Sequence, residues 1–475
     1  MSTATAPRER AGKTPLEPLP PHDRHLSGLD LAVLWGDLGI GLLVLVTASL
    51  LVPALGFAEA AVVIVIGSVV GVGLLGLAAA AGAEAGVPTM VLFRPVLGVR
   101  GSWVPSVLNA LQLIGWTAVE LWAMSFVADL VAERVFDLSL RWLWLVIAAA
   151  VCTGLAVWGP VGVTRVWMER FGVWVIGAIS VVVTVLVLTS DGIGAALAAP
   201  GAGGFPTLGP ALDLVIAMPI SWLPLVADYS RFGRSPKAAG TGVFVGYLIA
   251  NVWLYLLGVL LVLGAGATPT PEGIAAGVLA LAGGSIAGVL FLVGLLVGET
   301  DEAFADIYSG AVSLQNVFPR VSHRTLIGVI AVPGVVFAAW LTMDKYEVFL
   351  FLLGSVFVPL FGVLLAHYFV LPALESRRRG AGVADTRGLV HEAEPGFRWR
   401  AFVPWVAGFM VYHWVLPTGP AWWVEQVTAF ATPLAERFEW LPATLPSFLA
   451  AFALTIVLHP RSAPGGDGPT STIIR

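Results

Sequence analysis

A tryptophan and a glutamate lie one helical turn apart in the middle of a long apolar segment, Val104–Asp129. Trp116 and Glu120 are four residues apart, so a helix places both on one face, with Gln112 one turn earlier. An ionisable group in mid-membrane costs a few kcal/mol or more unless it faces a cavity or a partner. An aromatic plane beside a hydrogen-bond acceptor suits a flat ring. We predict a ring-binding site here; the alternative is a packed Trp beside a Glu paired with a neighbouring helix.

A second polar group ends the predicted eighth apolar segment, whose end is left open between Val297 and Asp306. Four carboxylates fall within eight residues, at Glu299, Asp301, Glu302 and Asp306. At membrane depth they would repel one another unless cations, protons or hydrogen-bond donors offset them. Thr300 and Asp301 offer hard oxygen ligands to Na⁺, or Asp301 carries a proton. The alternative is that the segment ends near Glu299 and that these residues are charges of a loop.

Glycine and proline gather inside two apolar segments at comparable positions. The first segment contains Trp-Gly-Asp-Leu-Gly-Ile-Gly at residues 35–41, and the sixth contains Met-Pro-Ile-Ser-Trp-Leu-Pro at residues 218–224. Each opens a set of five segments, which is the pattern of secondary transporters built from inverted repeats with discontinuous helices at the bilayer midplane. The alternative is that these residues are packing notches and a kink.

The elements that position these residues are membrane spans. Of 475 residues, 58% are apolar and 12% charged, against roughly a quarter charged in soluble domains. This composition excludes a water-soluble fold and a nucleic-acid-binding protein. Because a span needs about 20 residues, we predict an all-α integral membrane protein with about twelve transmembrane helices. The predicted spans are Leu29–Pro53, Ala60–Ala81, Val104–Asp129, Trp142–Trp158, Trp167–Thr189, Leu212–Tyr229, Ala238–Leu263, Ala276–Val297, Leu326–Leu341, Phe349–Leu371, Phe402–Leu416 and Leu445–Leu458.

Basic residues predict the orientation of these spans. Lysine and arginine concentrate in alternate connecting segments, beginning with the N-terminal one, and basic residues accumulate on the cytoplasmic side. We therefore expect a multi-pass protein of the plasma (cytoplasmic) membrane with both termini cytoplasmic. The expected parts are a disordered tail at 1–28, a first five-helix repeat at 29–190, a second at 210–372, a cytoplasmic loop at 373–400, helices 11 and 12 at 401–459, and a disordered tail at 460–475.

Five stretches of the sequence resemble one known transporter family. They are Leu34-Trp35 with Pro53, LQLIGWTAV at 111–119, PISWLPLVADY at 219–229, DIYS at 306–309 with Phe318-Pro319, and GSVFVPLFG at 354–362. Together they resemble the nucleobase:cation symporter-1 family of cytosine, purine, allantoin and hydantoin permeases, most closely its hydroxymethylpyrimidine branch. The resemblance implies twelve spans, with the five-plus-five inverted repeat of leucine-transporter-like sodium symporters followed by two C-terminal helices. It implies no catalytic residue.

The resemblance also implies the residues of a substrate site. Carried over by position, they are Trp116, Glu120, Trp222 or its neighbours Pro219 and Ser221, and Asp306. Gln112 is added from its place on the helix face of Trp116. Glu120 and Asp306 stand where the family has amides. Because a carboxylate only accepts hydrogen bonds, both changes favour a ligand rich in N–H donors, such as an aminopyrimidine, over uracil or hydantoin.

The implied cation site combines backbone carbonyls around Gly36 and Gly39 with side chains of Thr300 and Asp301. Asp301 stands where the family has a hydroxyl group, so coupling to Na⁺ and coupling to H⁺ both remain open. No other cofactor is expected. The resemblance assigns no role to Asp37, and the sequence leaves the oligomeric state open.

These features predict a cation-coupled permease that imports a nucleobase-like ring by alternating access. The preferred substrate is 4-amino-5-hydroxymethyl-2-methylpyrimidine or a related aminopyrimidine; the alternatives are cytosine, purines, allantoin and hydantoin. Spans one, two, six and seven would rock against the rest, with the tenth as a gate. The alternative of another class is a membrane enzyme that uses the carboxylates of span eight, but the sequence has no His-Glu-x-x-His motif.

Overall fold

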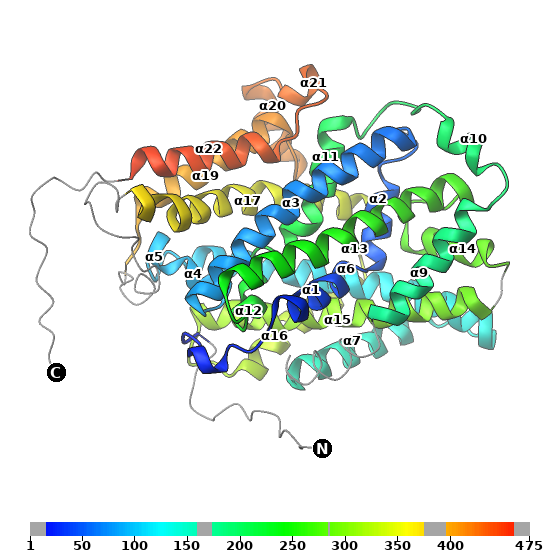
Figure 1. Ribbon diagram of the computed structural model, residues 1–475, viewed down its shortest axis with the longest axis horizontal. Helices are drawn as coiled ribbons and strands as arrows, with labels where there is room; N and C mark the ends of the chain where they lie inside the picture. Colours follow the sequence, from blue (N-terminus) through cyan, green and yellow to red (C-terminus); the bar gives the residue numbers. More distant parts are fainter. Residues whose placement is uncertain (1–15, 159–172, 284–285, 375–395, 460–475) are drawn as a thin grey trace, which may run out of the picture.

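The described part of the chain is a bundle of α-helices without a β-strand (Figure 1). The computed structural model describes residues 16–158, 173–283, 286–374 and 396–459. Within these ranges, six helices are long and apolar enough to cross a membrane, and the bent pair at the start makes a seventh. Large apolar side chains such as Trp142 and Ile249 are 58% and 61% exposed, as expected where lipid covers a surface.

The helices differ in length and continuity. The long ones are α3 (Phe57–Ala85), α6 (Trp103–Phe136), α7 (Arg141–Trp158), α13 (Pro236–Ala265), α15 (Ile286–Val317) and α17 (Met343–Leu365), which continues into the π-helix η3 (Ala366–Val370). Two pairs are interrupted, α1 (Gly28–Asp37) with α2 (Leu42–Ser49) and α11 (Leu208–Ser221) with α12 (Val226–Ser230). The others are η1 (Pro21–Asp23), α4 (Thr89–Leu92), α5 (Arg94–Leu97), α9 (Val173–Leu188), α10 (Ile193–Ala198), α14 (Pro271–Leu281), α16 (His323–Ala338), α19 (Trp399–Val415), α20 (Ala421–Phe430), α21 (Leu434–Arg437) and α22 (Thr444–Leu458).

The connection between α14 and α15 corrects the predicted eighth span. The predicted range Ala276–Val297 joins the end of one helix to the start of the next. The chain turns after α14, where Gly283 adopts a left-handed conformation (φ 59°) that glycine takes without strain. Helix α15 then runs on to Val317, so the acidic residues at 299–306 are inside a helix and most of them are buried. Their interpretation as loop charges is therefore wrong.

Both segments with internal glycine and proline are interrupted, as predicted. Helices α1 and α2 meet at an angle of 60°, around residues 38–41. Helices α11 and α12 are separated by residues 222–225, shortly after Pro219 inside α11. Because helix ends carry unpaired backbone N–H and C=O groups, a break inside the bilayer needs partners from the protein interior. Here α6 and α15, which pack side by side, supply those partners.

Segments predicted on the same side of the membrane contact one another. At one end of the molecule, Arg24 donates hydrogen bonds to the carbonyl groups of Leu19 and Ala83, at 3.1 and 2.8 Å, and Leu26 pairs with Gly233. The predicted disordered tail is therefore too long, because residues from 16 to 27 are held against the bundle. Residues 1–15 of that tail, the whole of the tail at 460–475, and most of the loop at 373–400 lie outside the described residues.

Candidate substrate and cation sites

One face of α6 carries the predicted ring-binding residues, and all of them are buried. Trp116 is 5% exposed, Glu120 1% and Gln112 3%. The indole of Trp116 makes edge-to-face contacts with Phe349 and Tyr346 of α17, with ring centroids 5.4 and 6.2 Å apart. Its Nε1 atom has no hydrogen-bond partner among the described residues. Trp116 thus belongs to an aromatic group and keeps an unused donor.

Gln112 ties α6 to the break between α11 and α12. Its Nε2 atom donates to the backbone oxygen of Ser221 at 2.9 Å and to Oδ1 of Asn109 at 3.0 Å. Asn109 in turn donates to Oγ of Ser313 on α15 at 2.7 Å. These amides satisfy a carbonyl group that the end of α11 leaves unpaired. The structure therefore places Ser221 beside the predicted residues of α6.

The other two predicted residues near this break pack elsewhere. Trp222 lies edge-on against Trp35 of α1, with ring centroids 5.8 Å apart and planes at 87°. The ring of Pro219 contacts Gly71 of α3 so closely that a Cβ atom at Gly71 would collide with it. Trp222 thus contacts the first interrupted span, whereas Pro219 packs against α3.

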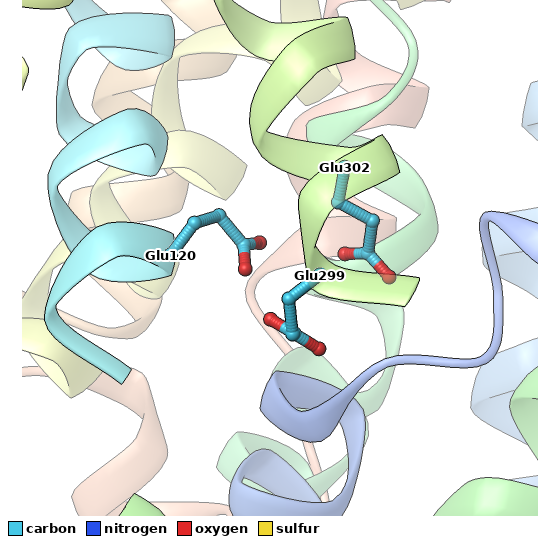
Figure 2. A group of neighbouring side chains, drawn as sticks. All are labelled: Glu120, Glu299 and Glu302. Atoms are coloured by element: carbon cyan, nitrogen blue, oxygen red, sulfur yellow. The ribbon is translucent and has the colours of Figure 1, made fainter. Parts of the chain in front are cut away.

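Three buried glutamates meet where α6, α15 and the break of the first span come together (Figure 2). Glu120 of α6 points toward Glu299 and Glu302 of α15, and one oxygen of each lies within 4.8 Å of the other two. The backbone N–H of Leu42, at the start of α2, donates to Oε1 of Glu299. A Cβ atom at Gly41 would collide with Glu302, so the interrupted span and the glutamates are in close contact. We call Glu120, Glu299 and Glu302 the glutamate triad.

Glu299, Glu302, Tyr346 and Phe349 were not assigned to the substrate site from the sequence. A signal for the two glutamates exists, because residues 299, 302 and 306 follow the i, i+3, i+7 spacing of one helix face. Asp306, which the sequence did assign, is 4% exposed and interacts electrostatically with Glu120 and Glu299. The structure therefore gathers a larger set of acidic groups around Glu120 than the sequence analysis assigned.

The predicted cation residues are two side chains of α15, Thr300 and Asp301, and two glycines near the break of the first span. Asp301 is 6% exposed and interacts electrostatically with Asp37 at the end of α1, while the hydroxyl group of Thr300 donates to the carbonyl of Leu296 at 2.8 Å. Both carboxylates and the lone pairs of the hydroxyl are hard oxygen donors of the kind that Na⁺ accepts. Asp37, to which the sequence assigned no role, lies near enough to Asp301 to be added to the predicted cation residues.

The glycines of the predicted cation site line the contact between α1 and α13. A Cβ atom at Gly39 would lie 2.8 Å from the Cβ of Ala250, and one at Gly36 would lie 3.6 Å from the oxygen of Gly246. Absence of a side chain at Gly39 thus permits close packing of the two helices. Both glycines stand at or near the break, where backbone carbonyl groups lose their helical partners.

Comparison with known proteins identifies the family. Residues 18–439 match the family described as permeases for cytosine/purines, uracil, thiamine and allantoin. The chain belongs to this permease family. The predicted resemblance is thereby confirmed, the protein is a permease, and the alternative of a membrane enzyme is set aside. Nothing in the comparison singles out the hydroxymethylpyrimidine branch, which stays a prediction.

Individual relatives of the permease are similar over most of their length. The cytosine permease of Escherichia coli (strain K12) is 27% identical over 345 residues, covering 70% of this chain and 73% of its own. The hydantoin permease of Microbacterium maritypicum is 24% identical over 452 residues, covering 90% and 89%. The structure of Mhp1, a nucleobase-cation-symport-1 family transporter with bromovinylhydantoin bound, superposes with a TM-score of 0.74 at 22% identity and covers 93% of both chains. This likeness supports the fold of a helical membrane transporter.

Proposed function

We propose that this permease imports a nucleobase-like ring together with a cation. The observation that carries the proposal is the buried face of α6, where Trp116 offers an aromatic plane and Glu120, one turn away, offers an acceptor. Both have an atom without a hydrogen-bond partner in the described structure, Nε1 and Oε2 respectively. A buried donor and acceptor left unused are costly, and a bound ring that pairs with them removes that cost.

The substrate that fits this face is an aminopyrimidine, with 4-amino-5-hydroxymethyl-2-methylpyrimidine preferred. Carboxylates only accept hydrogen bonds, and Asp306 adds to the acidic surroundings of Glu120. A ring with amino groups supplies the matching donors, whereas uracil and hydantoin present more carbonyl oxygens. Cytosine, purines and allantoin or hydantoin are the alternatives, favoured by the names of the relatives.

The proposed cation site lies between the end of α1 and the middle of α15, at Gly36, Gly39, Thr300 and Asp301, with Asp37 added. Na⁺ would be held by oxygen atoms of these residues, and H⁺ would be carried by Asp301. Alternating access would use the two interrupted spans as moving elements. Contacts among segments 16–27, 83–86 and 232–235 at one end of the molecule support a shared, cytoplasmic side for them, in a permease of the plasma membrane with both termini inside.

A ligand screen by melting temperature tests the proposed substrate class. Purified permease is heated with pyrimidines, purines, thiamine or hydantoins, each at a concentration well above its dissociation constant. A ligand that binds the folded state at 100 times its dissociation constant adds about 2.7 kcal/mol of stability, so aminopyrimidines are expected to raise the melting temperature most. If no ring of any class raises the melting temperature, the proposed function is wrong.

A further inference from the structure

The glutamate triad gathers three acidic groups that no basic side chain of the described residues offsets. The charged groups that interact with Glu120 are Glu299, Glu302 and Asp306, and Asp37 adds to the acids near Glu302. None of the three glutamates forms an ion pair with a lysine, arginine or histidine in the described part of the chain. The start of α2 contributes only about half of one positive charge. Buried carboxyl groups in this number either hold protons or pair with a positive partner.

Unused acceptor atoms lie in the same place as these acidic groups. Oε2 of Glu120, Oε2 of Glu299 and Oε1 of Glu302 accept no hydrogen bond from an N–H or hydroxyl group of the described residues, although the side chains are at most 4% exposed. The side-chain contacts of Glu120 are with the carboxyl groups of the other two glutamates. Figure 2 shows the three carboxyl groups turned toward one another from two facing helices. A partner that brings both hydrogen-bond donors and positive charge would satisfy these atoms and offset the acids.

The surroundings of the triad suit an organic cation. Tyr346 links the triad to the aromatic group, because its ring contacts Trp116 and its hydroxyl group interacts electrostatically with all three glutamates. Aromatic faces attract planar cations, and charge-assisted hydrogen bonds to carboxylates are about twice as strong as neutral ones. We infer that the triad and Trp116 bind a planar organic cation, a ring whose edge carries a positive charge and two or more N–H donors, such as a protonated aminopyrimidine. This inference rests on the proposed function and specifies the charge of its substrate.

A bare metal ion fits the triad less well. Ca²⁺ takes six to eight oxygen ligands, and the three carboxyl groups hold six oxygen atoms in all, one of each lying within 4.8 Å of the other two. Oε1 of Glu299 already accepts the N–H of Leu42, so the triad alone leaves fewer oxygen atoms than Ca²⁺ takes. Organic N–H donors need fewer oxygen atoms and can share the space with the aromatic rings.

Three pyrimidines of one size test the inference on the full-length permease. Uracil has no amino group, cytosine has one, and 2,4-diaminopyrimidine has two and takes a proton near neutral pH. Dissociation constants are measured for each at a single near-neutral pH. We expect 2,4-diaminopyrimidine to bind about tenfold or more tightly than uracil, with cytosine between them, because hydrogen bonds to charged groups are the stronger kind. Uracil binding as tightly as 2,4-diaminopyrimidine overturns the inference but leaves the proposed function standing, whereas no binding of any ring overturns both.

Variants that replace a glutamate with glutamine test whether the triad causes the preference for 2,4-diaminopyrimidine over uracil. E302Q and E120Q keep side-chain size, and each is expected to weaken binding of 2,4-diaminopyrimidine about tenfold while changing uracil binding less than about threefold. The control is E133Q, a change of an exposed residue on the same helix as Glu120, which should change neither. Melting temperatures measured with Ca²⁺, Mg²⁺ or Mn²⁺ alone test whether the triad binds a metal ion instead. If one of these ions stabilises the permease and E302Q removes that stabilisation, the inference of an organic cation is overturned. The inference is also overturned if both variants keep the full preference for 2,4-diaminopyrimidine over uracil.

Discussion

Replacing Trp116 with alanine is expected to weaken ring binding by about 1–3 kcal/mol, or roughly 5- to 150-fold in the dissociation constant, the range found when an aromatic side chain that stacks on a base is removed. Trp116 supplies the aromatic plane, and the rings of Phe349 and Tyr346 hold it in place. The measurement is the dissociation constant of the tightest ring found in the ligand screen. Unchanged affinity in this variant would show that the ring binds elsewhere.

Loss of a buried indole also lowers stability, so the control must share that cost. Trp122 is on the same helix, is 6% exposed and makes an edge-to-face contact with Phe126. Trp122→Ala removes as much buried area, and a large-to-small change of this kind costs about 3–5 kcal/mol. We expect both variants to melt at lower temperature and only Trp116→Ala to lose ring affinity.

Replacing Asp301 with asparagine is expected to abolish accumulation of substrate against its gradient while exchange of substrate across the membrane continues. Asparagine keeps the shape of the side chain but removes the charge that faces Asp37. Either coupling ion depends on that charge, since Na⁺ needs the carboxylate as a ligand and H⁺ needs it as a carrier. Exchange between equal concentrations requires only that the ring bind and that the permease change conformation.

Two transport assays in vesicles separate these steps. Accumulation is measured with an imposed ion gradient, and exchange is measured with labelled substrate outside and unlabelled substrate inside. Asp191→Asn, at an exposed position outside the helices, is the control and should leave both unchanged. If vesicles with the Asp301→Asn variant accumulate substrate as well as vesicles with the unchanged permease, Asp301 does not bind the coupling ion.

The membrane fold is readable from the sequence because hydropathy reports the lipid-facing surface directly. The breaks in spans one and six follow from local glycine and proline. The limits of span eight do not, because the acids at 299–306 lower its hydropathy although the protein buries most of them. Only the packing of α15 against α6 and the break before Leu42 reveals that their surroundings are protein.

The sequence predicts which residues of the site share a face of one helix, but not which helices contact one another. Spacing on α6 places Gln112, Trp116 and Glu120 on one face, and the structure keeps them together. No periodicity, however, states which helices face each other, so the contact of Trp116 with Tyr346 of α17 could not be predicted. The triad is hidden for the same reason, because Glu120 and Glu299 are 179 residues apart in the sequence and meet only through tertiary packing.

Accumulation of a labelled aminopyrimidine in vesicles is the most direct measurement of the proposed transport. Vesicles that contain the permease are given an imposed Na⁺ gradient, an imposed H⁺ gradient or neither. The proposed symport predicts accumulation above the external concentration with one of the two gradients and simple equilibration without them. Absence of accumulation under both gradients would contradict cation-coupled import of the ring.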